Sequence, residues 1–203
     1  MIKPDMTHVS TLEEFYNEIT KQQAGAHGEE YIQHHKALVR CIQDGCETIK
    51  ELGVCQGGTL GAMLLQKPKK LTGLDITARY FQPYQDLFNS YARENKVDFN
   101  FIVADSTNKD FVSDCDLLHI DSLHKPEHLM KELILHAPRV KKYIVFHDTA
   151  NFGGSRGLLG AIAKYITEVE QEWQIVDHYI QRVGYTVIKR VKRLEYIDKS
   201  NQT

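Results

Sequence analysis

Short apolar segments alternate with amphipathic segments over most of the chain. Five segments rich in apolar residues lie at 48–54, 71–75, 99–104, 115–121 and 143–147. They lack a regular alternation of apolar and polar positions, which is typical of strands buried on both faces of a parallel sheet. The segments between them have apolar residues at helical spacing, most clearly at Leu129, Met130, Leu133, Ile134 and Ala137. The pattern predicts an α/β fold with helices on both faces of a mostly parallel sheet.

The two ends of the chain depart from this alternation. Strands are predicted at 173–180 and 185–191, and the few residues between them are too short for a crossover, so the pair should form an antiparallel hairpin. At the other end, Ser10 and Glu13 have the spacing of a capping box and predict the start of a first helix. A second helix is predicted over about 28–44, with Gly45 as its stop. The expected fold is Rossmann-like, with seven strands and an antiparallel C-terminal hairpin.

The 203 residues fit one domain, since no repeat and no Pro- or Ser-rich linker divides them. We expect N-terminal helices over 1–45, a Rossmann-like core over 48–191 and a polar tail over 192–203. The aromatic residues between Tyr80 and Tyr91 repeat at helical spacing and fit the core or a contact in a homo-oligomer.

Composition narrows the class of partner. Lys and Arg total 25 against 27 for Asp and Glu, so there is no electrostatic reason to expect nucleic acid. The longest apolar run, 157–163, is too short to span a membrane, and the N-terminus lacks the apolar segment of a secretory signal. The four cysteines match neither a disulfide scaffold nor a zinc motif. We expect a reduced, cytoplasmic protein that acts on a small molecule.

Glycines follow the first predicted strand. Gly53, Gly57 and Gly58 allow a tight turn and a close approach of the backbone to a ligand, and Thr59 then begins a helix. The spacing is G-x-x-x-G-G and differs from the G-x-G-x-x-G of dinucleotide-binding folds, so a pyrophosphate is not the natural ligand.

Acidic residues follow the next two strands. Asp75 ends the second strand, where a carboxylate can accept both hydroxyls of a ribose. Asp105 and Ser106 end the third strand and are placed for the edge of a purine, although Ser106 taken alone is typical of a helix cap. Because parallel strands end at one edge of a sheet, the three ends together predict a nucleoside site.

With these motifs, the sequence resembles the class I S-adenosylmethionine-dependent methyltransferases over about 48–191. Within that class it is similar to the small family grouped with macrolide-sugar O-methyltransferases and cephalosporin-hydroxylase-like proteins. The residues that carry the likeness are Glu51-Leu52-Gly53 with Gly57-Gly58-Thr59, the run from His119 to His124, and Phe146-His147-Asp148-Thr149.

The resemblance implies a role for each part of the cofactor site. Glu51, Gly53 and Thr59 would surround the methionine part of S-adenosylmethionine. Asp75 would hold the ribose, and Asp105 with Ser106 would border the adenine. The antiparallel final hairpin also distinguishes this class from the dinucleotide dehydrogenases.

The fourth and fifth strand ends carry the candidate chemistry. Asp121 and Asp148 end neighbouring apolar segments, so their carboxylates can converge beside the sulfonium of the donor. Methyl transfer to oxygen requires the acceptor to be positioned and its proton to be removed. His124 matches the family position of the general base, and an imidazole suits this role because its pKa lies near neutrality.

A divalent cation held by Asp121 and Asp148 could lower the pKa of an acceptor hydroxyl. Relatives with a clear Mg²⁺ site have two acids at the fifth strand end, whereas this chain has His147 and Asp148. Three outcomes stay open at this point: Mg²⁺ held weakly by Asp121 and Asp148, a softer ion such as Mn²⁺ that also recruits His147, or no metal.

The predicted function is O-methylation of a small molecule of the sugar or phenol type. The alternatives are a non-catalytic module that binds a nucleoside or S-adenosylmethionine, and a metal-independent N- or C-methyltransferase. A nicotinamide-dependent oxidoreductase is disfavoured by the glycine spacing and the final hairpin. Among the other histidines, His119 is expected to be a hydrogen-bonded core residue, and His34 and His35 are expected at the surface. The segment 151–157 is predicted to be a loop whose Phe152 or Arg156 could cover the acceptor.

Overall fold

The computed structural model describes residues 5–150, 157–169 and 172–191. The α-helices are α1 (Leu12–His27), α2 (Glu30–Gln43), α3 (Gly58–Leu64), α4 (Gln85–Glu94), α5 (Pro126–His136) and α6 (Leu158–Lys164). The strands are β1 (Thr48–Leu52), β2 (Lys70–Asp75), β3 (Asp98–Val103), β4 (Cys115–Ile120), β5 (Val140–His147), β6 (Trp173–Tyr179) and β7 (Tyr185–Arg190). Short 3₁₀ turns lie at Gln82–Tyr84, Lys109–Phe111 and Ala137–Arg139, and a π-helical turn at Tyr165–Val169 follows α6.

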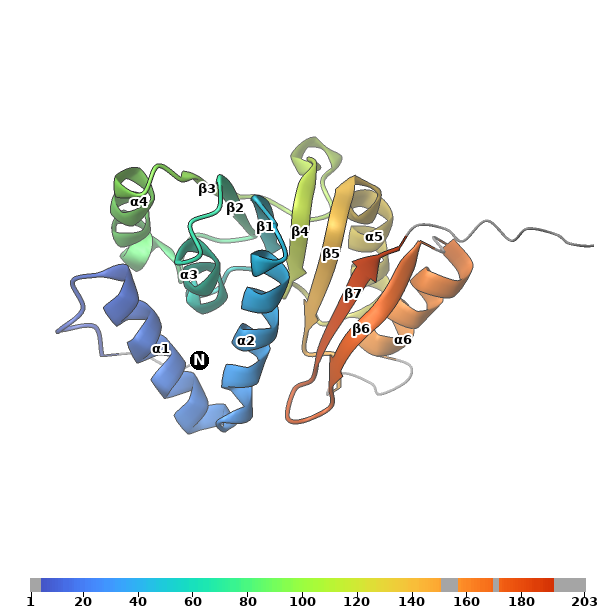
Figure 1. Ribbon diagram of the computed structural model, residues 1–203, viewed down its shortest axis with the longest axis horizontal. Helices are drawn as coiled ribbons and strands as arrows, with labels where there is room; N and C mark the ends of the chain where they lie inside the picture. Colours follow the sequence, from blue (N-terminus) through green and yellow to red (C-terminus); the bar gives the residue numbers. More distant parts are fainter. Residues whose placement is uncertain (1–4, 151–156, 170–171, 192–203) are drawn as a thin grey trace, which may run out of the picture.

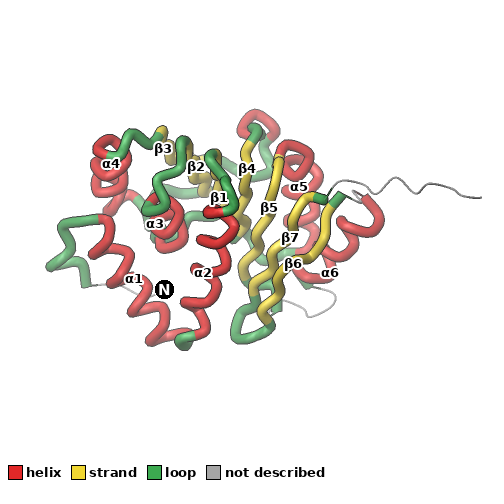
Figure 2. Tube along the Cα trace, viewed as in Figure 1, coloured by secondary structure: helices red, strands yellow, loops and turns green. Residues whose placement is uncertain are grey.

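The strands form one sheet in the order β3-β2-β1-β4-β5-β7-β6 (Figure 1). β1 to β5 run parallel, whereas β7 is antiparallel both to β5 and to β6. The predicted fold class, including the C-terminal hairpin, is therefore confirmed. The strands lie side by side between helices in Figure 2.

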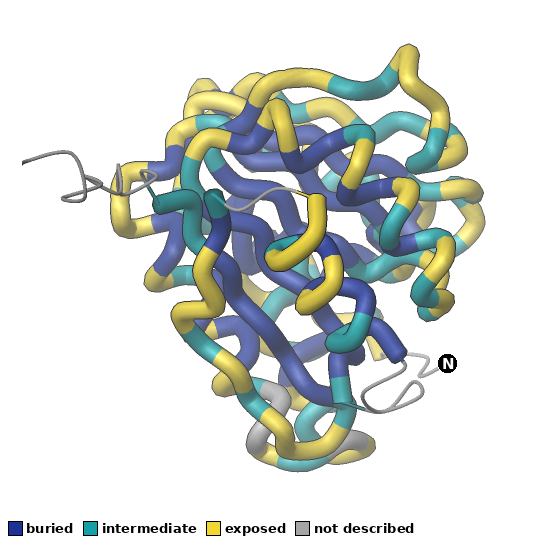
Figure 3. The backbone as a smooth tube through the Cα atoms, turned by 90° about the vertical axis from the view of Figure 1, so that its right-hand side faces the viewer, coloured by how far each residue is buried: buried dark blue, intermediate teal, exposed yellow. Residues whose placement is uncertain are grey.

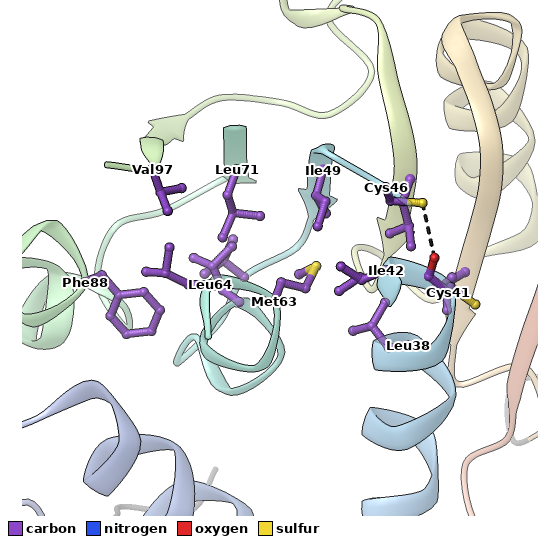
Figure 4. Close-up of a cluster of buried hydrophobic side chains, with 14 of the residues drawn as sticks. Leu38, Cys41, Ile42, Cys46, Ile49, Met63, Leu64, Leu71, Phe88 and Val97 are labelled. Carbon is purple, nitrogen blue, oxygen red and sulfur yellow. Dashed lines mark hydrogen bonds between the residues drawn. The ribbon is translucent and has the colours of Figure 1, made fainter. Parts of the chain in front are cut away.

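Each face of the sheet has its own apolar core, because the central strands are buried on both sides (Figure 3). One core joins β1, β2, β4, β5 and β7 to α1 through α4, and the other joins the opposite faces of the strands to α5 and α6. In the first core, Leu38 and Ile42 of α2 pack near Met63 of α3 and Ile49 of β1 (Figure 4). Burying one such aliphatic side chain contributes about 2 kcal/mol, so the two layers hold the strand ends in fixed positions.

The first helix begins one residue later than predicted. Thr11, not Ser10, is the N-cap, and its side chain accepts a hydrogen bond from the backbone N–H of Glu14 (3.1 Å). The Glu14 carboxylate accepts in return from the backbone N–H of Thr11 (3.1 Å), which completes the capping box. Ser10 also donates to this carboxylate, so neighbouring hydroxyl residues share one acid.

The remaining predictions concern the cysteines, membrane-spanning segments, the aromatic segment, the polar tail and the loop after β5. Cys41, Cys46, Cys55 and Cys115 are free thiols. Among the helices of the described ranges, none combines the length and the apolar character of a membrane span. Phe81 and Phe88 of the aromatic segment are fully buried core residues. The predicted polar tail and residues 151–156 of the predicted loop, with Phe152 and Arg156, lie outside the described residues.

Candidate functional site

The carboxyl ends of the central strands meet at one edge of the sheet through backbone hydrogen bonds. The N–H of Gly53 donates to the Leu74 carbonyl, and the N–H of Asp121 donates to the Leu52 carbonyl, both at 2.8 Å. Ala104, directly after β3, donates in the same way to the Asp75 carbonyl. The glycine turn and the predicted acidic residues therefore lie next to one another at this edge of the sheet.

Gly53 must be glycine for two reasons. Its φ is +86°, and a Cβ at this position would collide with the Asp121 carbonyl. The turn after β1 thus lies directly against the loop after β4. Gly57 has φ +85° and precedes α3, and a Cβ there would lie 2.9 Å from the Phe81 ring. Gly58 is the first residue of α3, and Thr59 follows it half-buried.

Asp75 anchors this turn. Its carboxylate accepts hydrogen bonds from the N–H groups of Val54 and Cys55, both at 2.9 Å, and from that of Thr77 at 3.0 Å. Asp105 is exposed and accepts from the backbone N–H and the hydroxyl of Thr107. These hydrogen bonds, first of all the one from the Thr107 hydroxyl, lower the pKa of Asp105.

Asp121, His124 and Asp148 form a compact cluster at the ends of β4 and β5. His124 Nε2 lies 3.2 Å from Asp121 Oδ1 and 2.8 Å from Asp148 Oδ2. One ligand atom from each residue lies within 4.8 Å of the others. Asp148 has φ +60°, a conformation that costs free energy in a non-glycine residue and is often found at functional sites.

The cluster is held together by charge. Hydrogen bonds to Asp121 and then to Asp148 raise the pKa of His124 to about 10. Burial opposes the ionisation of Asp148, but its hydrogen bonds with His124 and His147 outweigh burial and lower its pKa. At neutral pH, His124 is therefore an imidazolium between two carboxylates.

His147, predicted as a metal ligand, lies at the margin of this cluster. Its Nδ1 is 3.3 Å from Asp148 Oδ2 and 3.6 Å from Asp121 Oδ1. The three side chains that converge most closely include His124 in its place. Two carboxylate oxygens and one imidazole nitrogen at this separation are a donor set that fits a divalent cation.

Glu51 lies beneath the edge and not on its surface. It is 1% exposed, and its Oε1 lies 3.0 Å from Nδ1 of His119, its neighbour in the β1–β4 register. Within the described part of the chain, Glu51 Oε2 and His119 Nε2 have no hydrogen-bond partner. Burial raises the pKa of Glu51 well above its usual value and lowers that of His119 to about 4. The expectation that His119 is a hydrogen-bonded core residue is confirmed.

The expectation that His34 and His35 lie at the surface is wrong. They are 1% and 3% exposed because α2 packs this face against the sheet. The His34 ring stacks on Tyr185 with centroids 4.8 Å apart and meets His147 edge-on at 5.5 Å. Burial lowers the pKa of His34 to about 4, so a neutral ring packs behind the charged cluster.

Ser106 points away from the edge toward α5. Its hydroxyl donates to Glu132 Oε1 at 2.5 Å, and its carbonyl accepts from His136 Nε2 at 2.8 Å. Glu132 was not predicted as a site residue. The sequence signal for it is its spacing, because Glu132 lies three residues after Leu129 and so on the apolar face of the helix.

Two apolar side chains at the edge were also missed. Ile76, directly after Asp75, is 71% exposed, and Leu123, directly after Ser122, is 50% exposed. An exposed aliphatic group such as Ile76, next to the predicted ribose ligand in the chain, suits the face of an aromatic ring. A sequence pattern does not reveal them, because both residues look like ordinary core positions.

Known structures share this fold. A candidate caffeoyl-CoA O-methyltransferase from Staphylococcus aureus is 12% identical, with a TM-score of 0.63 over 89% of this chain and 92% of its own. An N-methyltransferase from Bradyrhizobium japonicum in complex with S-adenosyl-L-homocysteine is 14% identical (TM-score 0.59, over 89% and 97%). A magnesium protoporphyrin IX methyltransferase from Synechocystis with the same ligand is 13% identical (0.60, over 89% and 88%).

No family model matches the sequence, and no curated protein matches it. The likeness therefore establishes the fold: the chain has the Rossmann-like fold of solved S-adenosylmethionine-dependent methyltransferases.

Proposed function

We propose that this protein is an S-adenosylmethionine-dependent methyltransferase that methylates a hydroxyl oxygen of a small molecule of the sugar or phenol type. The observation that carries the proposal is the contact between the Gly53 turn and the Asp121 loop. It brings a candidate donor site and an Asp/His cluster to one edge of a methyltransferase fold. The near-neutral charge of the chain supports a small acceptor and gives no reason to expect nucleic acid.

The residues at the edge fit the donor. Ile76 and Leu123 can cover the adenine, and Asp75 and Asp105 offer carboxylates to the nucleoside. Just beneath the edge, the buried Oε2 atom of Glu51 has no hydrogen-bond donor among the described residues. The ammonium group of the methionine part would be such a donor. When bound, S-adenosylmethionine supplies an activated methyl group on a sulfonium.

The acceptor hydroxyl must lie in line with that methyl group and lose its proton. In our proposal, Asp121 and Asp148 orient the hydroxyl. His124 first loses its own proton to solvent, and the neutral imidazole then accepts the proton of the hydroxyl. A divalent cation held by the carboxylates of Asp121 and Asp148 would act as a Lewis acid toward the hydroxyl and leave His124 as the base. Because both carboxylates hold the proton on His124, we expect basic conditions or a cation to favour the active state.

Calorimetry with S-adenosylhomocysteine tests the donor site directly, and Asp75→Asn is the matched variant. We expect binding by the wild type and at least about tenfold weaker binding by the variant. A ribose hydrogen bond to a charged group contributes about 1.5 kcal/mol or more, and the variant also weakens the hydrogen bonds from Val54 and Cys55 that hold the turn. Wild-type protein that binds no S-adenosylhomocysteine would refute the proposal.

Transfer itself is tested with radiolabelled S-adenosylmethionine and a panel of sugars and catechols, with and without a chelator. His124→Ala should abolish transfer and leave the affinity for S-adenosylhomocysteine nearly unchanged. Equal loss of both would remove the proposed role of His124. Transfer only to amines, insensitive to the chelator, would instead support a metal-independent N-methyltransferase.

A further inference from the structure

A buried polar stripe runs along α5. His128, Glu132 and His136 follow one another at intervals of four residues and therefore lie on one face of the helix. Glu132 and His136 are 0% and 1% exposed. Buried polar side chains are costly unless they make hydrogen bonds, so what this stripe binds is informative.

All three members bind the loop that follows β3. The Ser106 hydroxyl donates to Glu132 Oε1 and lies 3.2 Å from His128 Nε2, and its carbonyl accepts from His136 at 2.8 Å. Ser106 follows Asp105, which we assign to the nucleoside. One face of α5 thus holds both the side chain and the backbone of Ser106 in place.

Glu132 also binds the loop that follows β4. The Ser122 hydroxyl donates to the same Oε1 atom at 2.6 Å. Ser122 follows Asp121 of the charged cluster. A single carboxylate oxygen therefore joins the loop assigned to the cofactor with the loop assigned to the reaction. Hydrogen bonds to a carboxylate are about twice as strong as those between neutral groups.

We propose that Glu132 is a positioning residue that holds the loops after β3 and β4 in fixed positions relative to each other. It thereby places Asp105 and Asp121 around one bound donor. The inference rests on the proposed function. Ser106 acts through Glu132 in this proposal, because its only hydroxyl hydrogen is given to the carboxylate and cannot be donated to the adenine.

The second oxygen of Glu132 makes a conservative variant possible. Oε2 has no hydrogen-bond partner in the described part of the chain, and Glu132 lines a small cavity together with Asp121 and His124. In Glu132→Gln the amide oxygen can replace Oε1 and the amide nitrogen can lie at the position of Oε2. In Glu132→Leu the volume is kept, and the hydrogen bonds from Ser106 and Ser122 and the 3.2 Å contact with His128 are lost.

The test measures the affinity for S-adenosylhomocysteine by calorimetry, together with thermal unfolding. We expect Glu132→Leu to weaken binding by about tenfold, because it loses the hydrogen bonds from Ser106 and Ser122. Glu132→Gln should weaken binding by less than about threefold, because its amide oxygen can still accept both, although more weakly. Glu127→Gln, on the exposed face of α5, is the charge-matched control, and Leu133→Ala is the control for lost stability. Both controls should keep wild-type affinity.

A double-mutant cycle separates the proposed role from a direct contact. Ser106→Ala should weaken binding in the wild type and have no further effect in Glu132→Leu. An equal loss in both backgrounds would overturn the proposal, as would wild-type affinity in a folded Glu132→Leu. If Glu132→Leu does not fold, Ser122→Ala takes its place in the test. Wild-type affinity for S-adenosylhomocysteine in Ser122→Ala would also contradict the proposal. No binding by the wild type would refute the proposed function itself.

Discussion

At the scale of single residues, His124 lies between two carboxylates that hold it in its protonated form. Asp121 and Asp148 raise its pKa to about 10, above the value of about 6.5 expected in the unfolded chain. A raised folded-state pKa contributes stability that is fully present below the unfolded pKa and is lost as the pH rises through the folded one. The contribution should therefore decline between about pH 6.5 and pH 10.

His124→Gln tests this dependence in the presence of a chelator. The variant should be less stable than the wild type at pH 6, and the difference in unfolding temperature should shrink by pH 10. Thermal unfolding across this range measures it. Asp148→Asn should lower the His124 pKa, as followed by NMR of the imidazole protons. A stability difference that does not vary with pH would mean that the ion pairs do not form.

The sequence placed Asp121, His124 and Asp148 together because strand ends in a parallel sheet share an edge. The same reasoning gave no role to Glu132, and the expectation of a surface position for His34 and His35 was wrong. Glu132 and Ser106 bind each other across 26 positions, and His34 is buried by a strand more than a hundred residues away. Local patterns do not contain such tertiary partners, so a buried acid in a helix looked like an exposed one.

At the scale of elements, the turn after β1 has the strictest steric requirement. Gly53→Ala should destabilise the protein by about 3 kcal/mol, because a Cβ at φ +86° meets the Asp121 backbone. Gly25→Ala is the matched control: it lies in α1 with open space around it, and should stabilise by about 0.5 kcal/mol. Chemical denaturation measures both. A tolerated Gly53→Ala would mean that the two loops are not in contact.

The start of α1 offers a second comparison within one element. Thr11→Ala removes the N-cap and should cost about 1 kcal/mol, whereas Ser10→Ala should stay within about 0.5 kcal/mol. Denaturant midpoints of the two variants give the answer. A larger loss of stability in Ser10→Ala than in Thr11→Ala would mean that Ser10 is the N-cap, as predicted from the sequence. The prediction was off by one residue because Ser10–Glu13 and Thr11–Glu14 have the same spacing.

At the scale of the whole molecule, the sequence predicted the sheet and its hairpin but not the order of the strands. Apolar runs identify buried strands, and the short connection over 180–184 requires an antiparallel pair. The order β3-β2-β1-β4-β5-β7-β6 depends on which helices cross which face. That information lies in packing between distant segments and became available only with the structure.

The order of the strands leads to a prediction about the entire fold. The donor site draws on the ends of β1, β2 and β3, and the cluster draws on the ends of β4 and β5, so ligands at the two sites should each stabilise the same cooperative unit. S-adenosylhomocysteine at a hundred times its Kd should add about 2.7 kcal/mol, which raises the unfolding temperature by about 5 °C or more.

Mn²⁺ should raise the unfolding temperature further in the wild type and not in the double variant Asp121→Asn/Asp148→Asn, which should still respond to S-adenosylhomocysteine. Scanning calorimetry with each ligand alone and with both separates the two effects. Two separate unfolding transitions would contradict a single cooperative sheet. Mn²⁺ stabilisation that persists in the double variant would place the cation elsewhere, because the two carboxylates supply the charge that a hard cation needs.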